Sequence, residues 1–245
     1  MKQFKLLEDF CIKKNLIYDP VKQDQFSLFC DHLIEKNKVM NLTAITDPEE
    51  IEVKHFIDSI ESASIIIDYA EKHNLKDQSI NIIDMGTGAG FPGIPLAILF
   101  PLIHFTLVDS LEKRIRFINE CLEICNINNV DTVHSRAEDI GHTEMRENFD
   151  ICISRAVASM PVLLEYTLPM VKTDGIDILY KSGSFTEEME KSENALRILT
   201  GSVDRISEFE LPGTDIRRSL ILINKTGYTP AGYPRKAGKP SKSPL

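Results

Sequence analysis

The chain has 245 residues, of which 42% are hydrophobic and 27% charged, an ordinary composition for a globular protein with a sizeable core. Its net charge of −9 argues against a protein that coats nucleic acid nonspecifically, although a local basic patch is compatible with it. The apolar runs are too short to span a bilayer, the first residues show no export signal, and the five scattered cysteines fit a reducing compartment. We therefore expect a cytoplasmic protein with no membrane partner.

The first part of the chain carries helical signals and no strand signal. Apolar residues recur at helical spacing in residues 3–14 and again after Asp19-Pro20, where an N-cap residue precedes a proline. Asp47-Pro48 repeats that device and opens a long helical pattern that reaches about residue 72. The sequence predicts an N-terminal helical cap over residues 1–72.

From residue 80 onwards, short apolar strands alternate with helical patterns. Strands are expected over the ranges 80–85, 105–109, 130–135, 149–154, 175–181, 203–211 and 219–224. Helices are expected over the ranges 92–99, 111–125, 160–171 and 186–200. This alternation predicts an α/β fold with a doubly wound, Rossmann-like sheet, and the last two strands predict a terminal antiparallel hairpin. We assign residues 73–226 to this domain.

A glycine-rich turn joins the first strand to the next helix. Gly86, Gly88 and Gly90 follow a strand that ends near Asp84, and Phe91-Pro92-Gly93 opens the helix. Glycine lets a ligand approach the backbone closely, and the N–H groups of a helix start favour a polar or anionic ligand. The turn predicts a nucleotide-cofactor site.

Two glycine spacings overlap in this turn and indicate different cofactors. Gly88-x-Gly90-x-x-Gly93 fits the dinucleotide fingerprint, so a NAD-dependent oxidoreductase is the alternative. Gly86-x-Gly88-x-Gly90 is typical of S-adenosylmethionine-dependent methyltransferases, and it begins directly after the strand. That interpretation also places Asp84 near the methionine amine. Asp109, at the end of the second strand, is expected at the ribose hydroxyls in either class.

Further candidates follow the third, fourth and fifth strands. Ala137-Glu138 lies just past the third strand, where methyltransferases usually hold adenine. Arg155 and Lys181 end the fourth and fifth strands, at the edge where open α/β sheets bind ligands, so both are candidates for a catalytic role. An ordinary ion pair is the alternative for Arg155.

The residues that many methyltransferases use on their acceptors are missing here. No Asn/Asp-Pro-Pro-Tyr element follows the fourth strand, and Cys152 lies in mid-strand, where a buried structural thiol is expected. Cys121 and Cys125 are expected in the core, with no metal site. An acceptor with a free lone pair, such as guanine N7, needs neither a nucleophile nor a strong base.

Residues 227–245 are rich in proline and glycine and predict an extended tail. From Lys225 to the last residue there are five basic residues and no acid. A basic tail can follow the phosphates of a nucleic acid, whereas a disordered solubilising end is the alternative. The candidate phosphate contacts are Arg114, Arg235, Lys236, Lys239 and Lys242.

Several motifs together resemble a known family. They are Asn37-x-x-x-Asn41-Leu42-Thr43, Lys54-His55-Phe56-x-Asp58-Ser59, the glycine turn, Val108-Asp109-Ser110, Ser154-Arg155-Ala156 and the tail from Tyr233 to Pro244. His55 and Asp58 could orient the acceptor or pack the cap on the sheet, and we expect packing. Asn37 and Asn41 are expected to form a hydrogen-bonded turn rather than to read a base. In order and over essentially the whole chain, the motifs resemble the 16S ribosomal RNA guanine-N7 methyltransferases, or glucose-inhibited division protein B family.

The resemblance implies a class I methyltransferase that uses S-adenosyl-L-methionine to methylate N7 of a guanine in 16S ribosomal RNA. The small ribosomal subunit is the implied partner, and we expect a monomer. An RNA-binding scaffold without activity is the non-enzymatic alternative. The expected cofactor contacts are Gly86, Gly88, Phe91, Asp109, Ala137, Glu138 and Arg155.

Overall fold

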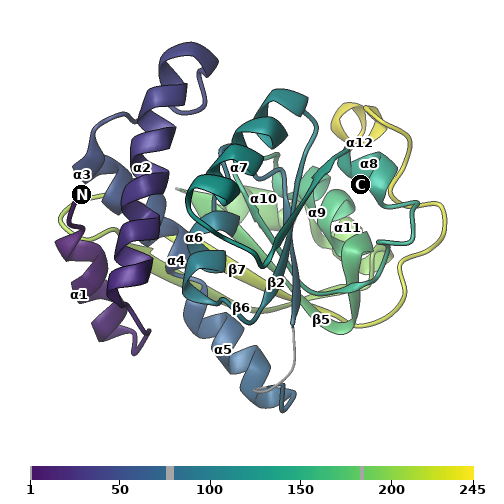
Figure 1. Cartoon of the computed structure of the whole chain (residues 1–245). Coiled ribbons are helices and arrows are strands. Elements are labelled where there is room, and N and C mark those ends of the chain that lie inside the picture. The colour runs from purple at the N-terminus through teal and green to yellow at the C-terminus, as the bar shows by residue number, and fades with distance from the viewer. Residues whose placement is uncertain (1, 76–79, 183–184) are drawn as a thin grey trace.

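The computed structural model describes residues 2–75, 80–182 and 185–245, and a seven-stranded sheet forms its centre (Figure 1). The strand order is β3-β2-β1-β4-β5-β7-β6. The strands β1 to β5 pair in parallel, and β7 is antiparallel to both β5 and β6. The doubly wound sheet and the terminal hairpin are thereby confirmed. The strands are β1 (Asn81–Met85), β2 (His104–Asp109), β3 (Val130–His134), β4 (Phe149–Arg155), β5 (Val171–Ser182), β6 (Gly201–Glu210) and β7 (Arg217–Lys225).

Successive residues of a strand point to opposite faces of the sheet. Residues of both faces are buried here, so both faces of the sheet are covered. In β1, Ile82 packs into the cluster under the cap, whereas Ile83 and Met85 pack into a second cluster on the other face. Within the described residues, no helix is both long and apolar enough to cross a membrane. The connecting helices are α6 (Gly93–Leu99), α7 (Glu112–Ile124), α8 (Ala137–Ile140), α9 (Met160–Thr167), η2 (Leu168–Met170), α10 (Thr186–Glu190) and α11 (Glu193–Ile198).

Two expected helices differ from the structure. The helix expected over 160–171 ends as the 3-10 turn η2, which contains Pro169, and β5 starts four residues earlier than predicted, at Val171. The helix expected over 186–200 is two helices, because a turn interrupts it where Ser192 donates its hydroxyl to the Glu188 carbonyl.

The expected cap is helical, and its N-caps act as predicted. Asp19 accepts a hydrogen bond from the backbone N–H of Lys22, and Asp47 accepts from the N–H groups of Glu49 and Glu50. The long helical pattern expected after Asp47 is helical as far as residue 72, with a π-helical turn within it and a break at residues 61–62. The cap elements are α1 (Lys5–Lys13), α2 (Pro20–Met40), α3 (Pro48–Ile51), η1 (Glu52–Ile57), α4 (Asp58–Ile60) and α5 (Ala63–Lys72).

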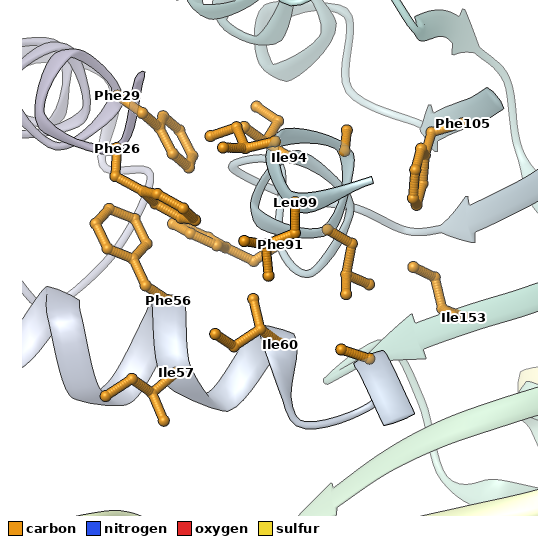
Figure 2. Close-up of a cluster of buried hydrophobic side chains, with 14 of the residues drawn as sticks. Phe26, Phe29, Phe56, Ile57, Ile60, Phe91, Ile94, Leu99, Phe105 and Ile153 are labelled. Atoms are coloured by element: carbon orange, nitrogen blue, oxygen red, sulfur yellow. The ribbon is translucent and has the colours of Figure 1, made fainter. Parts of the chain in front are cut away.

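Aromatic rings join the cap to the glycine turn (Figure 2). The ring centroid of Phe56 lies 4.9 Å from that of Phe26, and the centroid of Phe29 lies 5.2 Å from that of Phe91. All four side chains are buried, and burying each contributes about 1.5–3 kcal/mol. The turn is therefore fixed from the cap side as well as from the sheet.

The segment 227–245 is not simply an extended tail. It runs back over the body of the protein, with Pro234 and Pro240 buried, and it ends in the short helix α12 (Lys239–Lys242) near α8 (Figure 1). Pro240 lies in the first turn of α12, where the lack of an N–H costs no hydrogen bond. The prediction of a segment without helix is wrong, because this proline starts a helical turn.

Candidate functional site

A cavity of about 490 Å³ opens at the carboxyl ends of β1, β2 and β3. Parallel strands bring these ends to one edge of the sheet, which is where open α/β sheets bind ligands. Five residues predicted from the sequence line it, namely Gly86, Asp109, Arg114, Ala137 and Glu138. Val157, Tyr166, Gly238 and Ser241 also line it, and the sequence analysis missed all four.

The glycine turn closes one side of this cavity. Gly86 has φ +75°, and a Cβ atom there would lie 2.5 Å from Cγ2 of Val157. Both the backbone conformation and the contact with Val157 therefore require glycine. Gly88 follows with φ +63°, so the chain reverses within a few residues.

Asp84 supports the turn from below. Its Oδ2 accepts hydrogen bonds from Thr87 Oγ1 at 2.6 Å and from the backbone N–H of Gly93 at 2.9 Å. Burial raises the pKa of the Asp84 carboxyl to about 7. Asp84 does not line the cavity, so its expected contact with the methionine amine stays a prediction.

Asp109 is the carboxylate of the cavity wall, and its side chain is only 3% exposed. Its Oδ2 accepts from the Gly88 N–H at 3.0 Å and from Arg114 Nη1 at 3.1 Å, and its Oδ1 accepts from the Leu111 N–H at 2.9 Å. These donors fix the carboxylate against the glycine turn. Arg114, predicted to contact RNA phosphate, is thus engaged with Asp109.

Arg155 connects the end of β4 to the cap. Its Nη1 donates to Asp58 Oδ2 at 2.8 Å, and its guanidinium lies 5.2 Å from the centroid of the Phe91 ring. The imidazole of His55 stacks on the same ring, with centroids 4.5 Å apart. The expectation that His55 and Asp58 pack the cap on the sheet is confirmed, and the Phe91 ring lies in this joint rather than in the wall of the first cavity.

His55 is held neutral at this joint. Burial, followed by the neighbouring Arg155, lowers the pKa of His55 to about 3. Because arginine can only donate, the 3.5 Å contact of Arg155 Nη2 assigns the acceptor role to Nδ1. The proton then lies on Nε2, which is 2.9 Å from Thr43 Oγ1.

A second cavity, of about 420 Å³, adjoins the first. Ala156, directly after β4, lines both cavities, and it has the left-handed φ of +58°. Such strain in a residue with a side chain is held by the surrounding structure and occurs often at functional sites. Cationic side chains outnumber acidic ones by two around this cavity: Lys54, Arg155, Lys181 and Arg218 against Asp58 and Glu188.

Lys181 lies in the second cavity with its charge already paired. Its Nζ donates to Glu188 Oε2 at 2.7 Å and to the Ala158 carbonyl at 3.1 Å. Glu188 Oε2 also accepts from the Met160 N–H at 2.8 Å, which ties β5 to the start of α9. The structure thus brings Arg155 and Lys181, the two catalytic candidates, to one cavity.

Several other side chains named in the sequence analysis can be placed. Cys152 is fully buried, as expected of a structural thiol, and burial raises the pKa of the thiol well above the usual value. Cys121 and Cys125 lie in the core as expected. Asn37 forms the expected turn, since its Oδ1 accepts from the Leu42 and Thr43 N–H groups. In the part of the chain that the structure describes, no group of three or more His, Cys, Asp or Glu side chains is arranged to hold a metal ion.

Comparisons with known proteins agree with this geometry. Residues 22–220 match the model of the family described as rRNA small subunit methyltransferase G. The chain is 52% identical over 228 residues to the ribosomal RNA small subunit methyltransferase G of Acetivibrio thermocellus, covering 93% of this chain and 90% of that protein. It is 44% identical over 246 residues to the protein of the same name from Clostridium perfringens strain SM101, covering all of both chains.

Solved structures support the fold. The Bacillus subtilis YcgJ protein aligns with a TM-score of 0.51 and 12% identity, covering 68% of this chain and 98% of that one. M. jannaschii TYW2, solved in complex with AdoMet, aligns with a TM-score of 0.50 and 14% identity, covering 65% and 75%. The chain belongs to the rRNA small subunit methyltransferase G family, which confirms the enzyme class predicted from its motifs.

Proposed function

We propose that the protein transfers a methyl group from S-adenosyl-L-methionine to N7 of a guanine in 16S ribosomal RNA. One observation carries this proposal: cofactor residues predicted from the ends of three different strands line a single cavity. They are Gly86, Asp109, Ala137 and Glu138.

The residues of the first cavity fit a nucleoside with an attached amino acid. The cavity, at about 490 Å³, lies within the usual range for small-molecule sites. The Asp109 carboxylate is fixed by backbone donors and suits ribose hydroxyls, whereas the Ala137-Glu138 segment suits an adenine ring. The turn at Gly86 lets the ligand approach the backbone without a side chain between them.

The second cavity is the proposed place of the guanine. When bound, S-adenosylmethionine would supply an electrophilic methyl carbon on a sulfonium. The N7 lone pair would form the new bond to that carbon while the C–S bond breaks and S-adenosylhomocysteine leaves with its electron pair, so that no proton would have to leave the base. The protein therefore has to hold the base at the junction near Ala156, in line with the donor. Lys54 and Arg218 are cations of the wall that can contact guanine O6 or a flanking phosphate.

The neutral state of His55 fits this chemistry. An imidazole with a pKa of about 3 adds no positive charge beside a guanine that becomes positively charged on methylation. Arg155, paired with Asp58, is proposed to position the junction rather than to carry a proton, because arginine stays protonated.

The proposed RNA contacts outside the cavities are the lysines of the segment 227–245. Lys236, Lys239 and Lys242 are exposed and can reach phosphates, and their contribution should weaken with salt. Arg235 contributes less to such a surface, because its guanidinium is bound to Glu165. We propose a cytoplasmic monomer acting on the small subunit or its RNA.

The experiment is methyl transfer from labelled S-adenosylmethionine to small subunits and to 16S ribosomal RNA that lack the modification. Nucleoside analysis should find the label in 7-methylguanosine. Label in another nucleoside would overturn the guanine N7 assignment. Cofactor and RNA binding without any transfer would instead support the inactive scaffold.

A further inference from the structure

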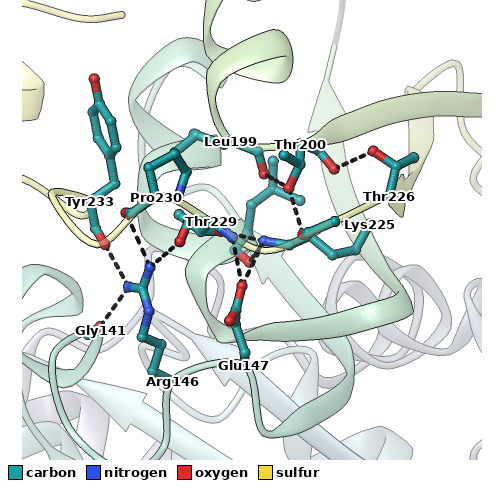
Figure 3. A network of polar contacts seen from close by, with 12 residues as sticks. Gly141, Arg146, Glu147, Leu199, Thr200, Lys225, Thr226, Thr229, Pro230 and Tyr233 are labelled. Carbon is teal, nitrogen blue, oxygen red and sulfur yellow. Dashed lines mark hydrogen bonds and ion pairs between the residues drawn. The ribbon is translucent and has the colours of Figure 1, made fainter.

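The segment 227–245, here called the strap, is anchored by the loop before β4 (Figure 3). The guanidinium of Arg146 donates to the carbonyls of Thr229 at 2.8 Å and Pro230 at 3.2 Å, and also to those of Tyr233 and Gly141. Hydrogen bonds from a charged group are stronger than neutral ones. One side chain thus holds three carbonyls of the strap against the body of the protein.

Glu147, next to Arg146, fixes the beginning of the strap (Figure 3). Its Oε1 accepts from the Thr229 N–H at 2.7 Å and lies 3.4 Å from Lys225 Nζ. Lys225 is almost completely buried and donates to the Leu168 carbonyl at 3.0 Å. The strap therefore leaves β7 in one fixed direction.

A second anchor lies further along the strap. Glu165, which is fully buried in α9, accepts two hydrogen bonds from the Arg235 N–H and Nε at 2.7 and 2.8 Å, and another from Nη2 at 2.6 Å. Pro234 lies so close to Gly141 that a Cβ atom on Gly141 would be 2.5 Å from the proline ring. Arg235 is thus a partly buried anchor of the strap, bound to a fully buried carboxylate.

Between these anchors and its end, the strap reaches the first cavity. The Gly238 N–H donates to Glu138 Oε1 at 3.0 Å, and the Tyr166 hydroxyl donates to the same oxygen at 3.4 Å. Ser241 Oγ lies 3.2 Å from that hydroxyl. Gly238 and Ser241 both line the cavity, so the strap supplies part of its wall.

We propose that the strap is part of the methyl-donor site: it positions Glu138 and closes the cavity around the adenosyl end of S-adenosylmethionine. This inference rests on the proposed function. The strap then has two faces with separate tasks. Its inner face, with Gly238 and Ser241, contributes to the binding of S-adenosylmethionine. Its outer face, with the exposed Lys236, Lys239 and Lys242, contacts RNA.

The test uses a substitution that loosens the strap at Arg146, a residue that does not line the cavity. Arg146→Met keeps an apolar stem but removes the hydrogen bonds to the carbonyls of Thr229, Pro230 and Tyr233, whereas His142 Nε2 still lies 2.7 Å from the Pro234 carbonyl. We expect the Kd for S-adenosylmethionine, measured by calorimetry, to rise about tenfold, as the loss of one bond to the charged Glu138 implies. Lys172→Met is the matched control, because it breaks an ion pair with Asp150 at the opposite edge of the sheet.

Two further variants separate the faces of the strap. Tyr166→Phe removes only the hydroxyl between Glu138 and Ser241 and should also raise the Kd, which keeps the test available if Arg146→Met does not fold. Alanine at Lys236, Lys239 and Lys242 should leave the Kd for S-adenosylmethionine unchanged and weaken RNA binding.

Limited trypsin digestion gives an independent readout. Cleavage after the exposed Lys236 and Lys242 should slow when S-adenosylmethionine is bound, and it should be faster in Arg146→Met than in wild type. Wild-type donor affinity in Arg146→Met or in Tyr166→Phe, or an equal loss in Lys172→Met, would overturn the role of the strap. Absence of donor binding in wild type would instead overturn the proposed function.

Discussion

Replacing Asp109 by asparagine tests whether the first cavity binds S-adenosylmethionine, because Asp109 is the carboxylate of the cavity wall. Three donors converge on this side chain, from Gly88, Leu111 and Arg114. Asparagine offers a single acceptor oxygen, and its NH₂ group would face one of those donors. At least one hydrogen bond is lost, and the proposed acceptor for the ribose becomes neutral.

The size of the effect follows from those contacts. A hydrogen bond to a charged group contributes about 1.5–3 kcal/mol, so the Kd for S-adenosylmethionine should rise roughly 10- to 150-fold in Asp109→Asn. Isothermal titration calorimetry measures this directly. Asp150→Asn is the control. Asp150 also accepts hydrogen bonds from a backbone N–H, that of Asn81 at 2.9 Å, and from a cation, Lys172. It lies at the amino ends of the strands, away from the donor cavity. A wild-type Kd in Asp109→Asn, or an equal rise in Asp150→Asn, would refute the reasoning.

Three further predictions concern the joint, the buried acid and the buried thiol. Arg155→Met should lower the free energy of unfolding, measured in urea, by about 3 kcal/mol. This is the low end for a broken buried ion pair, because Arg218 remains beside Asp58. An unchanged free energy of unfolding would contradict a structural role for the pair of Arg155 and Asp58. Burial raises the pKa of Asp177 to about 7, so the stability that its proton contributes is complete below about pH 4 and is lost as the pH rises to about 7. Asp177→Asn should flatten that decline in urea titrations across this pH range, and an unchanged slope would exclude Asp177 as its source. Cys152→Ala should keep methyl transfer, whereas a folded but inactive variant would restore a nucleophilic role for the thiol.

The donor cavity could be predicted from local patterns. The strand, glycine turn and helix around Gly86 are encoded within a few residues, and a parallel sheet necessarily brings the ends of its strands together. For that reason Asp109 and Glu138, far apart in the sequence, were placed in one site and do line one cavity. The wall formed by Val157 could not be predicted, because it depends on how the chain turns after β4.

The strap could not be predicted, because its contacts join residues distant in the sequence. Arg235 and Glu165 are separated by 70 positions, and Gly238 and Glu138 by 100. A segment of prolines and glycines has no hydrophobic period, so its sequence suggests only an extended chain. Its basic residues suggested phosphate binding for Arg235, whereas the fully buried Glu165 provides a closer partner.

The most direct test of the account is a crystal structure of the protein with S-adenosylhomocysteine and a guanine nucleotide. We predict the ribose at Asp109, the adenine beside Glu138 under the strap, and the sulfur directed past Ala156 toward a guanine N7 in the second cavity. A cofactor bound with its sulfur directed away from Ala156, or a guanine bound outside the cavity of Arg155 and Lys181, would contradict it.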